Sequence, residues 1–132
     1  MADSRFVTLA STSARSRLAS DVVIAGELGF VSGVRAADLN NDRVPLPEKV
    51  EAQTEKIFSN LDVILQAAGL ERRNVVAVRV YLVEFERLFE RMNTAYLRCI
   101  AIAPLPARTC VGVSQLTRGA QVEMDFVVRT TA

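Results

Sequence analysis

The sequence predicts a single α/β domain in which a mixed β-sheet carries two helices on one face. Segments with apolar residues at every second position alternate with two segments of helical spacing, in the order β-β-α-β-α-β-β. The chain has 132 residues, 50% of them hydrophobic, enough for a core that buries about two thirds of the surface of the unfolded chain. Because no linker or repeat divides it, we expect residues 1–132 to form one domain, with a partly mobile segment at residues 1–20.

The first two predicted strands lie in residues 21–33, "DVVIAGELGFVSG". Two short runs of β-branched or aromatic residues flank Gly26 and Gly29, where a hairpin or a bulge forms readily. This segment therefore predicts a pair of strands.

Two amphipathic helices are predicted from apolar residues that recur at helical spacing. The first covers residues 48–68, where Pro47 suits the helix start and Gly69 the C-terminal cap. Its apolar stripe consists of Val50, Ile57, Phe58, Leu61, Ile64, Leu65 and Ala68. The second helix ends before Pro104, and its stripe consists of Phe85, Leu88, Phe89, Met92, Tyr96 and Cys99 or Ile100.

Three further strands complete the predicted sheet. Residues 74–83 place Val76, Val78, Val80 and Leu82 on one face. Residues 107–115 and 120–128 are predicted to form a hairpin through "LTRG", and Val122, Met124, Phe126 and Val128 share one face of the last strand.

The second face of the central strand is also largely apolar, and two helices can cover only one face of a sheet. We therefore expect the uncovered face to be buried against another copy of the chain.

The residue types present exclude several kinds of catalytic site. The chain has no histidine, which removes Ser-His-Asp triads, Cys-His pairs and nearly all zinc or non-haem iron sites. Lys49 and Lys56 are the only lysines and lie in one charged helical segment, which disfavours a buried Schiff-base lysine. The stretch "GELGFVSG" has neither the GxGxxG spacing nor the lysine of a phosphate-binding loop. We therefore expect no metal and no nucleotide cofactor.

Charge and cysteine content bear on partners and location. The chain carries 16 basic and 15 acidic residues, a net charge of +1, so nucleic acid and anionic membranes are not expected as partners. Two cysteines are too few for a disulfide framework, and the sequence shows no apolar leader or long apolar run. These features favour a cytoplasmic protein.

Arg108 is the first candidate for binding chemistry. It follows Pro106 and Ala107 and begins a predicted strand, so its side chain is expected at one end of the sheet. A guanidinium presents a planar pair of donors that matches a carboxylate. The alternative is an ordinary surface arginine in an ion pair, and position alone does not decide between them.

Three other residues near these strands are weaker candidates. Glu123 is expected beside Asp125 on the strand face opposite Val122, either to hold and activate water or as one of two solvated acids. Cys110 shares the strand face of Arg108, and without histidine its backbone N–H is expected to matter more than its sulfur. Asn93 lies three residues before Tyr96 on the second predicted helix. Tyr96 belongs to the apolar stripe of that helix, so core packing is the first explanation for its presence.

The motifs together resemble those of one family. "PARTCVGV" followed by "QVEMDFVV" resembles the C-terminal signature of the Rid/YjgF proteins, the reactive-intermediate imine deaminases formerly labelled L-PSP endoribonucleases. The segments "FVSG", "NLDVILQAAGL" and "VVAVRVYLVEFERLFERMNTAY" resemble the early strand, first helix, central strand and second helix of that family. The resemblance covers nearly the whole chain from about residue 20.

The resemblance implies a chorismate-mutase-like fold with a mixed sheet of about six strands, assembled as a homotrimer with ligand sites in the clefts between subunits. It implies that Arg108 binds the substrate carboxylate, that Cys110 contributes backbone contacts, and that Glu123 positions or activates the attacking water. It also assigns pocket contacts to Ser32, Gly33 and Asn93. One departure is the stretch "SARSRLAS", which places Ala19 or a neighbour where the family has a pocket-closing tyrosine.

The implied activity is cofactor-free hydrolysis of small enamine or imine acids of the 2-aminoacrylate or 2-iminopropanoate type, giving a 2-oxo acid and ammonia. The imine carbon is already electrophilic, so orientation of the carboxylate and one water supplies most of what is needed. Two alternatives stay open: a non-catalytic metabolite-binding trimer that keeps the carboxylate clamp, and a deaminase of a ring-cleavage product such as 2-aminomuconate. RNA cleavage is disfavoured by the near-neutral charge and the absence of histidine.

Overall fold

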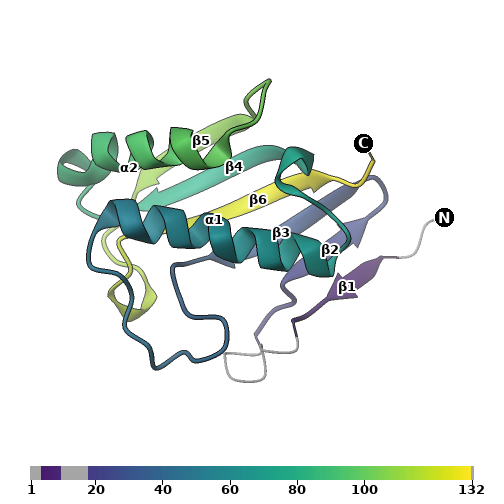
Figure 1. Ribbon diagram of the computed structural model, residues 1–132, viewed down its shortest axis with the longest axis horizontal. Coiled ribbons are helices and arrows are strands. Elements are labelled where there is room, and N and C mark those ends of the chain that lie inside the picture. Colours follow the sequence, from purple (N-terminus) through teal and green to yellow (C-terminus); the bar gives the residue numbers. More distant parts are fainter. Residues whose placement is uncertain (1–3, 10–17, 132) are drawn as a thin grey trace.

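Six strands form one mixed sheet in a computed structural model that describes residues 4–9 and 18–131 (Figure 1). The strands are β1 Arg5–Val7, β2 Val22–Ala25, β3 Leu28–Val34, β4 Val75–Leu82, β5 Ala107–Gly112 and β6 Val122–Arg129. Their order across the sheet is β1-β2-β3-β6-β4-β5, with β4 and β5 parallel and the other pairs antiparallel. This arrangement confirms the predicted mixed sheet of about six strands.

Strand β1 was not predicted. It lies inside the segment expected to be partly mobile and pairs with β2. Residues 1–3 and 10–17 of that segment lie outside the described residues, so its mobility stays a prediction.

Two helices, α1 Val50–Ala67 and α2 Phe85–Ile100, lie on one face of the sheet, as predicted (Figure 1). Helix α1 ends at a glycine cap, because Gly69 has a φ of 76° and the Leu70 N–H reaches back to the Leu65 carbonyl at 2.8 Å. Two short 3₁₀ turns, η2 Arg72–Asn74 and η3 Thr117–Gly119, precede β4 and β6. No helix in the described part of the chain has the length and apolar character needed to cross a membrane.

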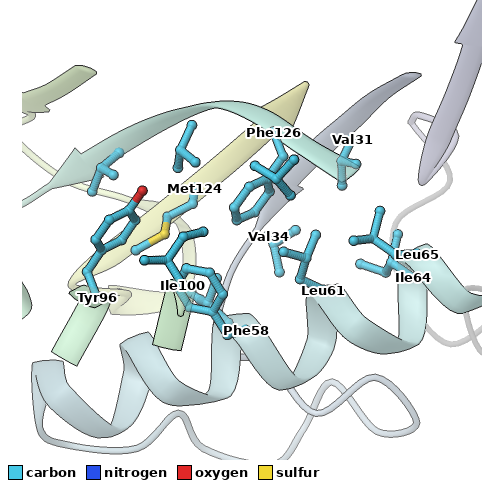
Figure 2. Packing of buried hydrophobic residues seen from close by; sticks show 14 of the residues in the cluster. Val31, Val34, Phe58, Leu61, Ile64, Leu65, Tyr96, Ile100, Met124 and Phe126 are labelled. Carbon is cyan, nitrogen blue, oxygen red and sulfur yellow. The ribbon is translucent and has the colours of Figure 1, made fainter. Parts of the chain in front are cut away.

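Phe58 lies at the centre of the core between both helices and the sheet. Its ring is fully buried and makes edge-to-face contacts with Tyr96 of α2 at 5.8 Å and Phe126 of β6 at 6.0 Å between centroids. Figure 2 shows these rings with Met124 and Ile100 between the helices and the sheet. One side chain thus joins three elements that are distant in sequence.

The predicted hairpin between the last two strands is wrong. β4 lies between β5 and β6, pairing with β5 in parallel and with β6 antiparallel. The chain passes from β4 through α2 into β5 as a crossover unit, which fills one edge of β4. β6 pairs with the other edge and with β3, where Val122, Met124, Phe126 and Val128 are buried.

A bulge also changes one predicted core position of β4. The register of β4 against β6 shifts between Val75 and Ala77. As a result Val75 is 4% exposed and belongs to the core, whereas Val76 is only partly buried. Val78, Val80 and Leu82 are buried as predicted.

The sheet face opposite the helices, here called the open face, carries an apolar row across all six strands. The strand registers align Phe6, Val23, Phe30, Val127, Ala77 and Ala107. Phe6 is 67% exposed and Phe30 47% exposed in the single chain. Such a row is typical of a surface that another protein surface covers.

We expect Phe58→Ala to lower the free energy of unfolding by about 3–5 kcal/mol, because it leaves a cavity between both helices and β6. The matched control is Val63→Ala on the same helix, where the side chain is 49% exposed and the expected change is within about 0.5 kcal/mol. Urea unfolding of both variants measures the difference, and equal losses would contradict the central role of Phe58.

An ion pair between the helices predicts a pH-dependent contribution to stability. Arg91 donates to both carboxylate oxygens of Glu51, at 2.8 and 3.0 Å, and this contact lowers the Glu51 pKa from 4.5 to about 2. Because the folded-state pKa is the lower one, the stabilisation is complete above pH 4.5 and is lost as the pH falls towards 2. Both side chains are over a third exposed, so solvent screens the pair and its contribution to stability is small.

Glu51→Gln is therefore expected to destabilise slightly at neutral pH and to match the parent chain near pH 2. The control Glu90→Gln removes a carboxylate that forms no ion pair among the described residues. Thermal unfolding across this pH range tests the difference, and a Glu51→Gln effect that persists undiminished in acid would refute the assignment.

Candidate functional site

Arg108 lies on the helix-covered face of the edge strand β5, beneath α2. It pairs in register with Val78, which is 1% exposed in the core. Its Nη2 donates a hydrogen bond to Oδ1 of Asn93, and its guanidinium carbon lies 4.6 Å from the centroid of the Tyr96 ring. The fold thus brings together two of the predicted site residues, Arg108 and Asn93.

The partners of Arg108 are all uncharged. No ion pair among the described residues includes Arg108, and its Nε is buried without a hydrogen-bond partner. The Tyr96 ring and the Asn93 amide orient the guanidinium but do not neutralise it. This arrangement leaves a full positive charge available to an anion.

Cys110 lies two residues further along the same strand face, paired with Val80, as the sequence predicted. Burial raises the pKa of its thiol, and the nearby Arg108 opposes this shift without overcoming it. The thiol therefore stays protonated at neutral pH, which disfavours a role as nucleophile. We refer to Asn93, Tyr96, Arg108 and Cys110 as the arginine cluster.

Glu123 lies on β6 and faces away from the helices, as predicted. It lines a pocket of about 360 Å³ together with Ser32 and Gly33 of β3. Burial raises the pKa of its carboxyl, the nearby Arg35 opposes the shift, and Asp125 adds to it. We refer to Ser32, Gly33, Arg35 and Glu123 as the glutamate pocket.

Gly33 leaves room for the Glu123 side chain. A Cβ at Gly33 would lie 2.9 Å from Cδ of Glu123 and closer still to Oε2. Ser32 joins β3 to the segment before β2 that also lines the pocket, since its hydroxyl donates to the Ser20 carbonyl at 2.6 Å. Ala19 also lines the pocket, as its place in "SARSRLAS" indicated, whereas residues 13–17 of that stretch lie outside the described residues.

Arg35 is a pocket residue that the sequence reasoning missed. Its Nε lies 3.5 Å from Oε1 of Glu123. The only signal in the sequence was a charged residue two positions after Gly33, and strict strand alternation from Val31 would have turned that residue towards the core.

Asp125, the second acid of β6, is already occupied. Its carboxylate accepts hydrogen bonds from the Tyr81 hydroxyl and from Nε of Arg79, both at 2.8 Å. The bond to Asp125 and burial raise the pKa of Tyr81. Of the two acids on this strand face, Glu123 is thus the one that faces the pocket.

The arginine cluster and the glutamate pocket do not meet within one chain. Arg108 faces the helices from β5, whereas Glu123 faces the open side from β6, with β4 between the two strands. Within the described residues, no group of three or more His, Cys, Asp or Glu side chains is arranged to hold a metal ion. The chemistry available consists of anion binding at Arg108 and proton transfer at Glu123.

Comparison with known proteins identifies the family. The sequence profile of the family described as Endoribonuclease L-PSP matches residues 9–130. A RutC family protein of Aquifex aeolicus (strain VF5) is 35% identical over 99 residues, which cover 74% of this chain and 77% of that protein.

Two further relatives carry names that refer to imine chemistry or to the Rid family. A 2-iminobutanoate/2-iminopropanoate deaminase of Dermatophagoides farinae is 30% identical over 110 residues, which cover 83% of each protein. The crystal structure of RidA from the Antarctic bacterium Psychrobacter sp. PAMC 21119 superposes with a TM-score of 0.82 at 27% identity, covering 95% of this chain and 99% of that one. The chain therefore belongs to the family described as Endoribonuclease L-PSP, the Rid/YjgF family whose motifs its sequence carries.

Proposed function

We propose that the protein is a cofactor-free deaminase of small enamine or imine acids of the 2-aminoacrylate or 2-iminopropanoate type. The observation that carries this proposal is the uncompensated charge of Arg108, which is oriented by neutral groups and has one buried donor without a partner. The name of the Dermatophagoides farinae relative supports the same class of substrate.

In the proposed mechanism, Arg108 binds the substrate carboxylate through two parallel charge-assisted hydrogen bonds. Glu123 accepts a proton from a water molecule as its oxygen bonds to the imine carbon, and the π electrons of the C=N bond move to nitrogen. The proton returns to this nitrogen and gives a neutral carbinolamine. Glu123 then accepts the hydroxyl proton and passes it to the nitrogen as the C–N bond breaks, so that the C–O bond becomes a carbonyl and the products are ammonia and a 2-oxo acid. Cys110 and Asn93 contact the carboxylate end, and Ser32 and Gly33 line the water side.

We propose further that this site forms between copies of the chain in a homotrimer. Arg108 and Glu123 face opposite sides of their own sheet, so one substrate reaches both only when they come from two copies. The apolar row on the open face, including Phe6 and Phe30, supports burial of that face in an assembly. A cytoplasmic location and the absence of nucleic-acid and membrane partners stay predictions from charge and composition.

One observation favours a second function, carboxylate binding without turnover. Ala19 lines the glutamate pocket, and the family resemblance places Ala19 or a neighbour where the family has a tyrosine. Ala19 gives the pocket a smaller wall than a tyrosine would. Occupancy of Arg108 by a 2-oxo acid without deamination of any imine, including that of 2-aminomuconate, would favour this alternative.

Replacement of Arg108 tests the carboxylate clamp. With an L-amino-acid oxidase supplying imino acids, we expect the protein to accelerate 2-oxo acid release and Arg108→Gln to lower kcat/KM roughly 10- to 100-fold, the value of a charged hydrogen-bonded contact. The control Arg98→Gln removes an exposed arginine whose pairing with Glu55 spans 3.7 Å. Equal acceleration by the parent chain and Arg108→Gln, or none by either, would refute the proposed function.

Mixed assemblies test whether two copies share each site. Arg108→Ala and Glu123→Gln are each expected to retain about a tenth or less of the parental activity alone, because each removes one half of every site. Co-refolding equal amounts restores about one quarter of the parental sites, since one interface then combines an intact Arg108 with an intact Glu123. No recovery in mixtures shown by mass spectrometry to contain both chains would contradict a shared site.

A further inference from the structure

The structure assigns a positioning role to Arg35: we propose that this arginine holds the Glu123 side chain in place over Gly33 and keeps it as an oriented carboxylate. The inference deepens the proposed function, because it concerns the group that activates water there. Neither the motifs of the sequence nor the relatives' names point to Arg35.

The contact between the two side chains fits this role. Nε of Arg35 lies 3.5 Å from Oε1 of Glu123, and the two side chains are only 28% and 26% exposed. Solvent screens such a half-buried pair less than it screens a fully exposed one. Nη1 of Arg35 is buried and has no hydrogen-bond partner, so Glu123 is the anion paired with this guanidinium among the described residues.

The opposite side of the carboxylate lies against the backbone. Oε2 of Glu123 lies against Gly33, where a Cβ would collide with the carboxyl group. One oxygen therefore faces Arg35, while the other lies over a surface that only glycine provides. These two contacts restrict rotation of the carboxylate, which a base that must meet one water molecule requires.

The other charged groups around Glu123 do not replace Arg35. On β6, Asp125 is an acid and is bound by Tyr81 and Arg79 of β4. On the pocket wall, Asp21 is a further acid and accepts the Leu9 N–H at 2.8 Å. Among residues 4–9 and 18–131, Arg35 is thus the cation that directly opposes protonation of Glu123.

The balance of these influences suits a base at neutral pH. Burial alone favours the protonated acid, which cannot accept a proton from water, and the charge of Arg35 works against it. A base that is both partly buried and paired with a cation keeps its carboxylate form while remaining close to the reacting water.

The test measures the Glu123 titration directly. Protein labelled with ¹³C at glutamate carboxyl carbons is titrated by NMR, and the Glu123 signal is assigned by its loss in Glu123→Gln. The variants are Arg35→Gln, Arg35→Met, which retains the aliphatic stem for packing, and Arg35→Lys, which retains the charge. Arg87→Gln is the matched control, because this arginine pairs with Glu84 at 2.8 Å on α2.

We expect the Glu123 midpoint to move to higher pH in both neutral variants and to stay near the parental value in Arg35→Lys and Arg87→Gln. The acid limb of the kcat/KM profile should move to higher pH in the same two neutral variants. An unchanged midpoint in whichever neutral variant folds, or an equal shift in Arg35→Lys, would overturn the positioning role.

The two readouts separate this inference from the proposed function. An NMR shift in a protein without deaminase activity supports the role of Arg35 and refutes the activity. Deaminase activity that is lost in Glu123→Gln, together with a Glu123 midpoint that is unchanged in the neutral Arg35 variants, supports the proposed function and refutes the role of Arg35.

Discussion

The position of β6 between β3 and β4 is the constraint on which the rest of the molecule depends. Strands on both sides pair with β6, and its side chains alternate between the two faces of the sheet. Met124 and Phe126 therefore enter the core, where Phe126 meets Phe58, and Glu123 and Asp125 face away from the helices. The packing that stabilises the fold thus also determines which side of the sheet carries the acids.

The same topology gives the two halves of the proposed site different electrostatic environments. Arg108, on the far side of β4, lies among an aromatic ring, an amide and a thiol, and none of these neutralises its charge. Glu123 lies on the face of the sheet opposite to that of Arg108, and there it pairs with a cation, Arg35. One side thus offers an uncompensated cation and the other a carboxylate in a partly buried pocket, and the proposed hydrolysis of a small imino acid requires both.

Local patterns predicted more of this structure than long-range pairing. Helical spacing indicated α1, and period-two alternation identified both the buried face of β6 and the shared face of Arg108 and Cys110, because these features depend on neighbouring residues. The predicted hairpin of β5 and β6 failed because adjacency in sequence does not determine adjacency in a sheet once a helical crossover has filled one edge. The motifs pointed to Arg108, Asn93 and Glu123, but not to their distribution over two faces.

Arg35 shows why alternation did not predict one residue of the glutamate pocket. From Val31, which is buried, strict period-two counting assigns Gly33 and Arg35 to the core side. The pairing of β3 with β6 shifts register between Val31 and Val34, however, so Val34 is also buried and Arg35 turns to the face of Glu123. An irregularity of one strand thus converts a position that would have buried an unpaired charge into one that places a cation beside the acid.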